Sequence, residues 1–166
     1  VDRLSQALSI SIGKVQLKAL VGSGQFGGRR VILAKPQTYM NLSGQSISSL
    51  VRYYKIPVDQ VLVAHDDLDL PLGTLRLRPS GGSGGQKGIA STIEQLGTAG
   101  FARMRMGIDR PPGQMDAAAY VLQNFPPREF ELVDATLDRA VKAAMLFIEQ
   151  GLDAAMNLYN GSLKEG

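Results

Sequence analysis

Short apolar runs separated by glycine, proline and acidic residues dominate the first 70 positions of the chain. Three of them have the length and the Val, Ile and Leu content of strands: KVQLKALVGSG (14–24), which stops at glycine, RRVILAKP (29–36) and QVLVAHDDL (60–68). Near-continuous apolar runs are typical of strands buried on both faces. Between the last two runs, four residues recur at helical spacing: Ile47, Leu50, Val51 and Tyr54. Strand, helix, strand predicts a βαβ unit whose two strands form a parallel pair.

The rest of the chain continues to alternate between strands and helices. A strand in TLRLRP (74–79) carries Arg76 and Arg78 on one face, and a second strand around MRMGI (104–108) repeats the alternation with Arg103 and Arg105. Shorter helices are predicted in VDRLSQAL (1–8), IASTIEQLG (89–97) and LDAAMNLYN (152–160). The longest helix is predicted over 127–150, with an apolar stripe of Phe130, Val133, Leu137, Val141, Ala144 and Ile148. No repeat and no second domain is visible, so 1–166 is predicted to be one α/β domain.

Composition narrows the classes of function. With 166 residues, 44% of them hydrophobic and 20% charged, the chain has the size and balance of one globular domain. It has no cysteine and one histidine, which excludes a disulfide framework and a structural zinc site. No apolar run is long enough to span a bilayer, and the start shows no signal-peptide pattern. The net charge of +3 permits a polyanionic partner without requiring one.

The segment GGSGGQKG (81–88) lies between a predicted strand and a predicted helix, and five of its eight residues are glycine. Glycine loses much conformational freedom on folding, so this density indicates backbone with positive φ or a close approach by another group. One interpretation is a flexible Gly/Ser linker. The other is a cradle for phosphate or nucleic acid, in which backbone N–H groups at the start of a helix face an anion.

Asp66, Asp67 and Asp69 follow a predicted buried strand, and the carboxyl ends of strands are where ligands bind in open α/β sheets. These acids equally fit a polar turn or a cap on the next element. His65 is predicted to point away from Asp66, which favours a structural role, although it is the only histidine that a Ser-His-Asp site would have.

Two further groups of residues are candidates for chemistry. By residue type alone, Met40 fills a gap in a wall, and Asn41 or Ser43 caps the following helix. Arg78 and Arg105 flank the glycine loop in sequence and are placed to hold one phosphate between them, unless they form a solvated strand face.

Three segments, KPQTYMNLSGQS (35–46), VLVAHDDLDLPLGTLRLRPSGGSGGQKG (61–88) and RMRMGIDRPPG (103–113), in this order and spacing resemble the bacterial-type peptidyl-tRNA hydrolase family, including its organellar members. The resemblance implies one α/β domain with a twisted mixed, largely parallel sheet flanked by helices. It implies hydrolysis of the ester between a peptide and the tRNA 3′ end, without a metal or cofactor. The implied partner is the acceptor stem of peptidyl-tRNA. The resemblance also implies that the protein is a monomer and that it does not bind a membrane.

Residue roles follow from the resemblance position by position. Asp66 would orient the family's catalytic histidine, Asn41 would bind near the scissile ester or the peptide backbone, and Met40 would line that pocket. Arg78 and Arg105 match a basic pair that clamps a tRNA phosphate.

The glycine loop, including Gly85, resembles the rim against which the acceptor end lies. The family has a His-Asn pair where this chain has Gln86 and Lys87. Gln86 keeps hydrogen-bonding capacity, whereas Lys87 replaces a neutral amide with a cation, which suits a phosphate contact.

A second departure concerns the family's catalytic histidine, which lies in an N-terminal segment after the first strand and an Asn-Pro-Gly loop. These 166 residues contain no such segment, so we expect the general base and one central strand to be missing from them. Two functions stay open: an esterase of which this is an incomplete form, or a non-catalytic RNA-binding relative of the group II intron splicing type. The resemblance to organellar and cyanobacterial members predicts a chloroplast, another organelle or a bacterial cytoplasm as the location.

Overall fold

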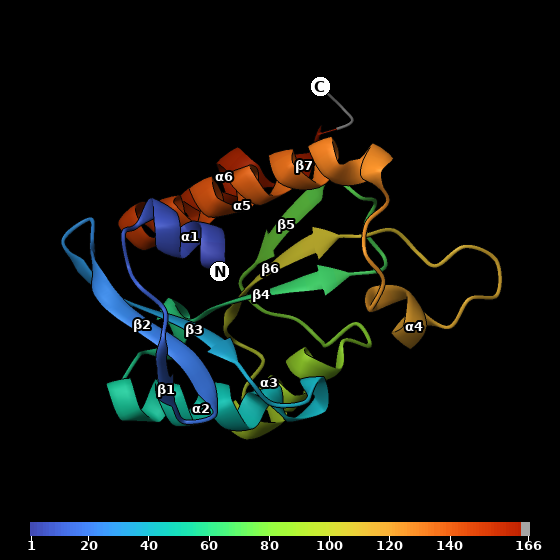
Figure 1. The fold of residues 1–166 in the computed structure, drawn as a ribbon. Helices are drawn as coiled ribbons and strands as arrows, with labels where there is room; N and C mark the ends of the chain where they lie inside the picture. Colours follow the sequence, from blue (N-terminus) through green and yellow to red (C-terminus); the bar gives the residue numbers. More distant parts are fainter. Residues whose placement is uncertain (164–166) are drawn as a thin grey trace.

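Two β-sheets lie between two layers of helices in the computed structural model, which describes residues 1–163 (Figure 1). The strands are β1 (Lys14–Gln16), β2 (Ala19–Phe26), β3 (Arg29–Pro36), β4 (Leu62–Asp67), β5 (Thr74–Arg78), β6 (Ala102–Gly107) and β7 (Gly161–Ser162). The α-helices are α1 (Asp2–Ala7), α2 (Ser43–Tyr54), α3 (Lys87–Leu96), α4 (Ala117–Val121), α5 (Phe130–Gln150) and α6 (Leu152–Tyr159). Single 3₁₀ turns occupy Met40–Leu42, Val58–Gln60 and Pro127–Glu129. None of the helices in residues 1–163 is both long enough and apolar enough to cross a membrane.

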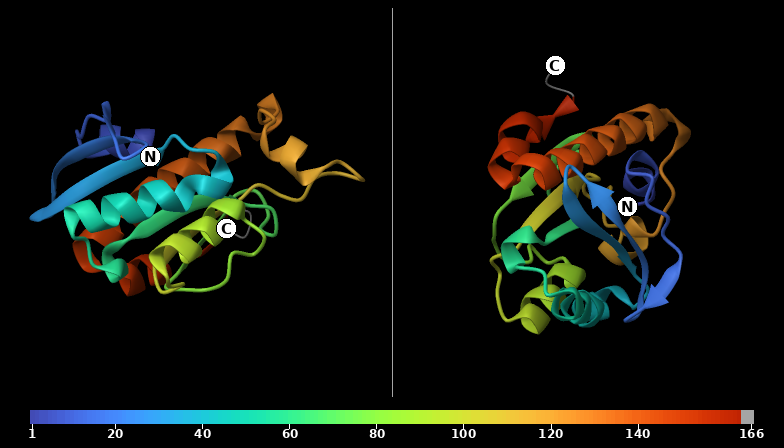
Figure 2. Two further views of the ribbon diagram at one scale, coloured as in Figure 1. Left: turned by 90° about the horizontal axis from the view of Figure 1, so that it is seen from below. Right: turned by 90° about the vertical axis from the view of Figure 1, so that its left-hand side faces the viewer.

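Apolar residues fill both interfaces between the sheets and the helices. One face of the second sheet, with Leu75, Leu77 and Met104, is covered by α5 and α6. The opposite helix layer consists of α2 and α3, which lie side by side (Figure 2). There Ile89 of α3 packs against Phe101 in a separate cluster. β4 packs Leu62 against the first of these clusters and Val63 against the second, and contact on both faces explains its nearly continuous apolar run.

The strand order corrects two expectations. The sheets have the orders β1-β2-β3 and β4-β6-β5-β7, and among the described strands only β4 and β6 pair in parallel. The prediction of one α/β domain with mixed strands is confirmed, but the prediction of a largely parallel sheet is wrong. β3 and β4, expected to form a parallel pair across α2, belong to different sheets. A strand–helix–strand pattern specifies the connection, but it does not specify which strand becomes the neighbour.

Two local predictions also differ from the structure. The run 14–24 is not one strand that ends at glycine: it turns at Leu17 and Lys18, which have φ of +49° and +62°, and pairs with itself as β1 and β2. The helix α2 has Leu42 at its N-cap and no side-chain cap, so neither Asn41 nor Ser43 caps it. The preceding 3₁₀ turn carries the chain into the helix instead.

The longest helix forms where it was predicted, but Ala144 alone of the predicted stripe is fully buried. Its buried residues are Thr136, Ala140, Ala143 and Ala144, whereas Phe130 at its first turn is exposed. The other apolar residues of the predicted stripe are partly buried, and Ile148 packs against the cluster formed by Leu8, Ile10, Val31 and Leu33.

Candidate functional site

A pocket lies where the glycine loop crosses the arginine-bearing face of the second sheet. β5 and β6 pair antiparallel so that Arg76 is opposite Arg105 and Arg78 is opposite Arg103. Because side chains alternate along each strand, all four arginines leave the sheet on one face, and leucine and methionine occupy the other. The pocket has a volume of about 480 Å³ and is lined by His65, Asp67, Arg78, Ser80, Gly81, Gly82, Ser83, Gly84, Arg103 and Arg105. Arg78 and Arg105 thus both line the pocket beside the glycine loop, and their joint contact with a phosphate stays a prediction.

Arg103 holds the first two residues of the glycine loop against the sheet. Arg103 Nη1 donates to the main-chain oxygens of Gly81 (2.7 Å) and Gly82 (3.0 Å), and Nη2 donates to Ala99 O (2.9 Å). The guanidinium also lies 4.4 Å from the ring centroid of Phe101. Only 2% of Arg103 is exposed, and this burial, together with the charge of Arg105, lowers its pKa.

Glycine is required in this loop at the positions with positive φ. These are Gly81 (+142°), Gly84 (+58°) and Gly85 (+84°). Both Gly84 and Gly85 are exposed, and nothing lies within 4 Å of a side chain built on either, so the loop presents bare backbone to solvent.

The three predicted carboxylates have different surroundings. Asp67 accepts from Arg105 Nε (2.6 Å) through one oxygen and from the Asp69 backbone N–H (2.9 Å) through the other. Asp69 pairs with Arg110 at 2.7 Å. The polar-turn interpretation therefore holds for Asp67 and Asp69. The carboxylate of Asp66 makes no hydrogen bond or ion pair within residues 1–163, and it lies opposite Met106 on the other face of the sheet.

His65 lines the pocket as a neutral ring. Its Nδ1 lies 2.7 Å from the main-chain oxygen of Asp66, and since a carbonyl oxygen only accepts, Nδ1 carries the proton. Its Nε2 is buried and has no partner among the described residues. Burial lowers the pKa of His65, mainly by penalising the charged ring. The prediction that His65 points away from Asp66 is confirmed, because it lines the pocket with the arginines.

A second group of predicted residues meets next to the loop. Gln86 Nε2 donates to Met40 Sδ (3.4 Å), while Gln86 Oε1 accepts from the Ile89 backbone N–H (2.7 Å) and so caps α3. A side chain at Gly88 would meet Met40 Sδ at 2.7 Å, so the glycine lets the sulfur approach the helix. The capping role of Gln86 was missed at the sequence level.

Asn41 and Lys87 are exposed, and the side chains of both make no hydrogen bond or ion pair within the described part of the chain. The structure thus forms two clusters, the arginine pocket and the Met40–Gln86 contact, and Asp66 lines neither. No group of three or more His, Asp or Glu side chains in residues 1–163 is arranged to hold a metal ion.

Comparison with known proteins identifies the family. A sequence profile described as peptidyl-tRNA hydrolase matches residues 1–166. The chain belongs to the peptidyl-tRNA hydrolase family. It is 46% identical over 160 residues to the peptidyl-tRNA hydrolase of an Exiguobacterium species. The matched region covers 96% of this chain and 86% of that protein. It is 47% identical over 161 residues to the chloroplastic peptidyl-tRNA hydrolase of Arabidopsis thaliana, covering 96% of this chain and 56% of that protein.

A solved structure agrees with the sequence relatives. The crystal structure of peptidyl-tRNA hydrolase from Acinetobacter baumannii has a TM-score of 0.90 and 31% sequence identity, and covers 97% of this chain and 82% of that one. The predicted family and the predicted α/β architecture are confirmed. The roles of individual residues at the site stay predictions.

Proposed function

We propose that this protein hydrolyses the ester bond between a peptide and the 3′ end of tRNA, so that the tRNA can be used again in translation. The observation that carries the proposal is the match of the whole chain, residues 1–166, to the peptidyl-tRNA hydrolase family. The pocket adds physical support, because Arg78 and Arg105 line it together with exposed glycine backbone. Guanidinium groups and bare N–H groups are the usual donors to RNA phosphates.

The substrate would cross from the arginine pocket to the Met40–Gln86 contact. Arg78 and Arg105 hold a phosphate of the acceptor stem, and Gly85 allows the strand to lie close to the rim. The exposed Lys87 adds a cation next to the rim. Asn41 binds the peptide backbone or the scissile ester, and Met40 lines that end of the site.

The reaction needs a general base that takes a proton from water as the water oxygen attacks the ester carbonyl. The carbon–oxygen bond to the ribose then breaks, and the 3′ hydroxyl leaves with a proton. Asp66, with its carboxylate unpartnered among the described residues, holds and orients the base, a histidine in the family. The one histidine of this chain bonds the main chain of Asp66 instead of its carboxylate. His65 is therefore not the base that Asp66 orients. The proposed reaction uses no metal or cofactor.

The test measures release of N-acetylated amino acid from N-acetyl-aminoacyl-tRNA, a minimal peptidyl-tRNA, by the 166-residue chain and by the longest product of its gene. We expect little turnover by the 166 residues alone, since loss of a general base costs about 10²–10⁴ in rate. In the longer product, Asp66→Asn should lower kcat by a similar factor and change KM little, because Asp66 acts on the base and not on the RNA. Arg105→Ala should raise KM.

The matched control is Asp69→Asn, which removes a carboxylate from the same acidic run but only an exposed ion pair with Arg110. It should leave kcat within about twofold, since exposed ion pairs contribute little. An Asp66→Asn effect confined to KM would contradict the assigned role, and full turnover by the 166 residues would mean that one of these residues serves as the base.

One observation favours a second candidate, an RNA-binding relative without hydrolysis. Gln86 has its Oε1 engaged in capping α3, and Lys87 puts a cation where the family has a neutral amide. Tight, salt-dependent tRNA binding by the longest gene product with no ester cleavage would select this candidate. For either function we expect a monomer that acts in an organelle or in a bacterial cytoplasm.

A further inference from the structure

The positive charge of the chain is concentrated in one part of the sequence. Residues 3–58 contain eight Lys and Arg and no acidic residue, so all 15 acidic residues lie elsewhere. This stretch folds into most of α1, the sheet β1-β2-β3 and α2. Neither Arg78, Arg105 nor Lys87 of the proposed hydrolase site belongs to it. Arg3 pairs with Asp134 and Asp138, and Lys35 pairs with Asp2. The other six cations of the stretch form no ion pair among the described residues, and cations of this kind attract polyanions.

Two of these cations surround a pair of tyrosines, and we call this group, Lys14, Arg30, Tyr53 and Tyr54, the β1–α2 patch. Lys14 and Gln16 leave β1 on the same face, and Gln16 Oε1 accepts from Tyr54 OH at 2.8 Å. The Arg30 guanidinium lies 5.4 Å from the Tyr54 ring centroid. β1, β3 and α2 thus meet at one place.

The groups of the patch are available to a ligand. Lys14 and Arg30 are exposed, and neither forms a hydrogen bond or an ion pair in the part of the chain that the structure describes. The Tyr53 side chain is 61% exposed, and its ring stands edge-on to Tyr54, with centroids 4.9 Å apart and an interplanar angle of 84°. Contact with Tyr54 restricts the Tyr53 ring, while the network to Gln16 and Arg30 fixes Tyr54. The result is an ordered aromatic surface flanked by unpaired cations.

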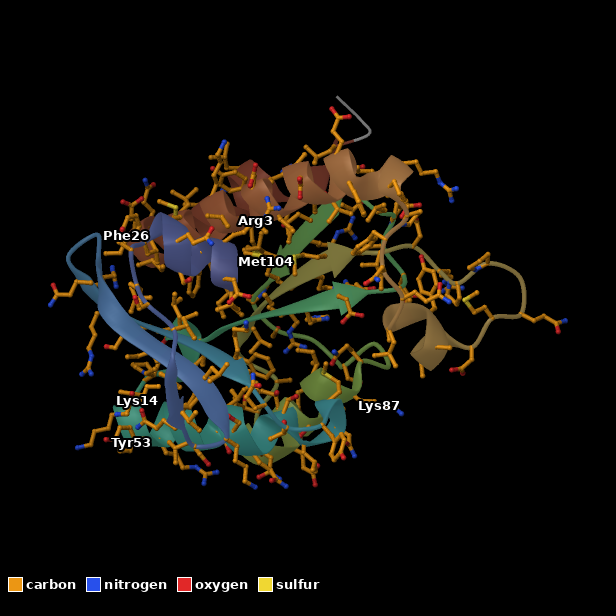
Figure 3. The ribbon with its side chains drawn as sticks, viewed as in Figure 1. Arg3, Lys14, Phe26, Tyr53, Lys87 and Met104 are labelled. Carbon is orange, nitrogen blue, oxygen red and sulfur yellow. The ribbon has the colours of Figure 1, made fainter. Side chains whose placement is uncertain are left out.

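The patch is separate from the hydrolase site. Figure 3 shows Lys14 and Tyr53 at one end of the α2–α3 helix layer and Lys87, which begins α3 next to the glycine loop, at the other end. A ligand at the patch therefore contacts different atoms from those that Arg78 and Arg105 hold.

We propose that the β1–α2 patch is a second RNA-binding surface, where Lys14 and Arg30 hold backbone phosphates and Tyr53 stacks on an unpaired base. Proteins that bind single-stranded RNA combine a cationic groove with aromatic rings in this way, because every base has a flat face and every nucleotide has a phosphate. A lipid surface would use the cations but has no group that stacks on a tyrosine ring. The inference goes beyond ester hydrolysis and does not require it.

The test is fluorescence anisotropy with a labelled 20-nucleotide single-stranded RNA that has no acceptor stem, titrated at several salt concentrations. The variant is Lys14→Ala/Arg30→Ala. The control is Arg128→Ala/Lys142→Ala, which removes the same charge from exposed positions outside the basic stretch. We expect the patch variant to flatten the slope of log K against log salt by about 1.4, or about 0.7 per lost phosphate contact on a single strand. The control should change the slope little.

Tyr53 supplies a second measurement. Tyr53→Ala should weaken binding about tenfold, in the range for one stacked base, and Tyr53→Phe should keep wild-type affinity because the ring remains. Equal losses in the patch and control variants, or no loss in either, would overturn the proposal, as would Lys14- and Arg30-dependent binding to phosphatidylserine vesicles without binding to the RNA. Failure of ester hydrolysis, or of Arg105→Ala to affect acceptor-stem binding, would remove the proposed function and leave this result unchanged.

Discussion

Four arginines that look equivalent in the sequence have different surroundings in the structure. The period of two predicts that Arg76, Arg78, Arg103 and Arg105 share a face, and the β5–β6 register confirms it. The sequence does not show which of them the glycine loop covers. Arg103 is buried and holds that loop, Arg105 pairs with Asp67, and Arg78 is exposed. Sequence patterns predict the face of a strand, whereas burial depends on a loop some twenty residues away.

The role of Arg103 can be tested by Arg103→Lys, which keeps the charge but cannot donate to three carbonyls in a fixed fork. Net hydrogen bonds from a charged donor contribute about 1.5–3 kcal/mol, and two of the three are expected to be lost. We expect a loss of about 3 kcal/mol or more in the free energy of unfolding, measured with urea. Hydrogen exchange of residues 81–85 should become faster.

The control for Arg103→Lys is Arg78→Lys, because Arg78 lies opposite Arg103 on the neighbouring strand. Arg78 is exposed, so this change should alter stability by no more than about 0.5 kcal/mol. Unchanged exchange of the loop in Arg103→Lys would mean that the glycine rim is ordered without the guanidinium.

At the scale of elements, the helices and strands with strong periodicity were predicted well, and glycine was the main source of error. Gly22 and Gly24 were taken as a strand end, yet they lie inside β2. A side chain at Gly22 would overlap the main chain of Ser11, and one at Gly24 would overlap Ile10. The glycines are there because the segment after α1 crosses the strand closely, a long-range contact with no local signal.

Gly44 shows the same close approach between two helices. It is the second residue of α2, its N–H donates to Ser91 Oγ at 3.0 Å, and an added side chain would overlap the main chain of Ser91 in α3. Because α2 follows Met40 directly and α3 begins after Gln86, this contact sets the spacing of the Met40–Gln86 cluster.

Gly44→Ala should therefore separate the two helices and lower the free energy of unfolding. Overpacking against main chain costs about 1–3 kcal/mol, and this exceeds the helix propensity that alanine gains so near the N-terminus. Gly13→Ala is the control, since nothing lies within 4 Å of a side chain there and φ is not positive. It should stay within about 0.5 kcal/mol of wild type in the same urea titration. A neutral Gly44→Ala would show that the α2–α3 spacing can adjust.

At the scale of the whole molecule, the sequence predicts the layers but not the division into two sheets. Helices alternate with strands, which is enough to place strands between helix layers. The alternation does not predict which strands become neighbours. β6, for example, lies between β4 and β5 although it follows both in the chain. Such an order depends on pairing between distant segments. The arginine pocket could not be predicted from the sequence for the same reason, because it forms only where β5 and β6 are neighbours.

The division into two sheets puts β3 and β4 at sheet edges, as β1 and β7 are among the described strands, and this can be measured. Within residues 1–163, β3 pairs only with β2 and β4 pairs only with β6, whereas β6 has neighbours on both sides. Unpaired N–H groups at an edge exchange with solvent faster than those inside a sheet. In the 166-residue chain we expect the amides of β6 to be the slowest, and the amides of β3 and β4 that point away from their partners to exchange at least tenfold faster. Hydrogen exchange read by NMR at several protein concentrations checks this. Protection of β4 equal to that of β6 at every concentration would mean that another part of the molecule covers the edge, and protection that rises with concentration would mean that two chains pair there, against the expected monomer.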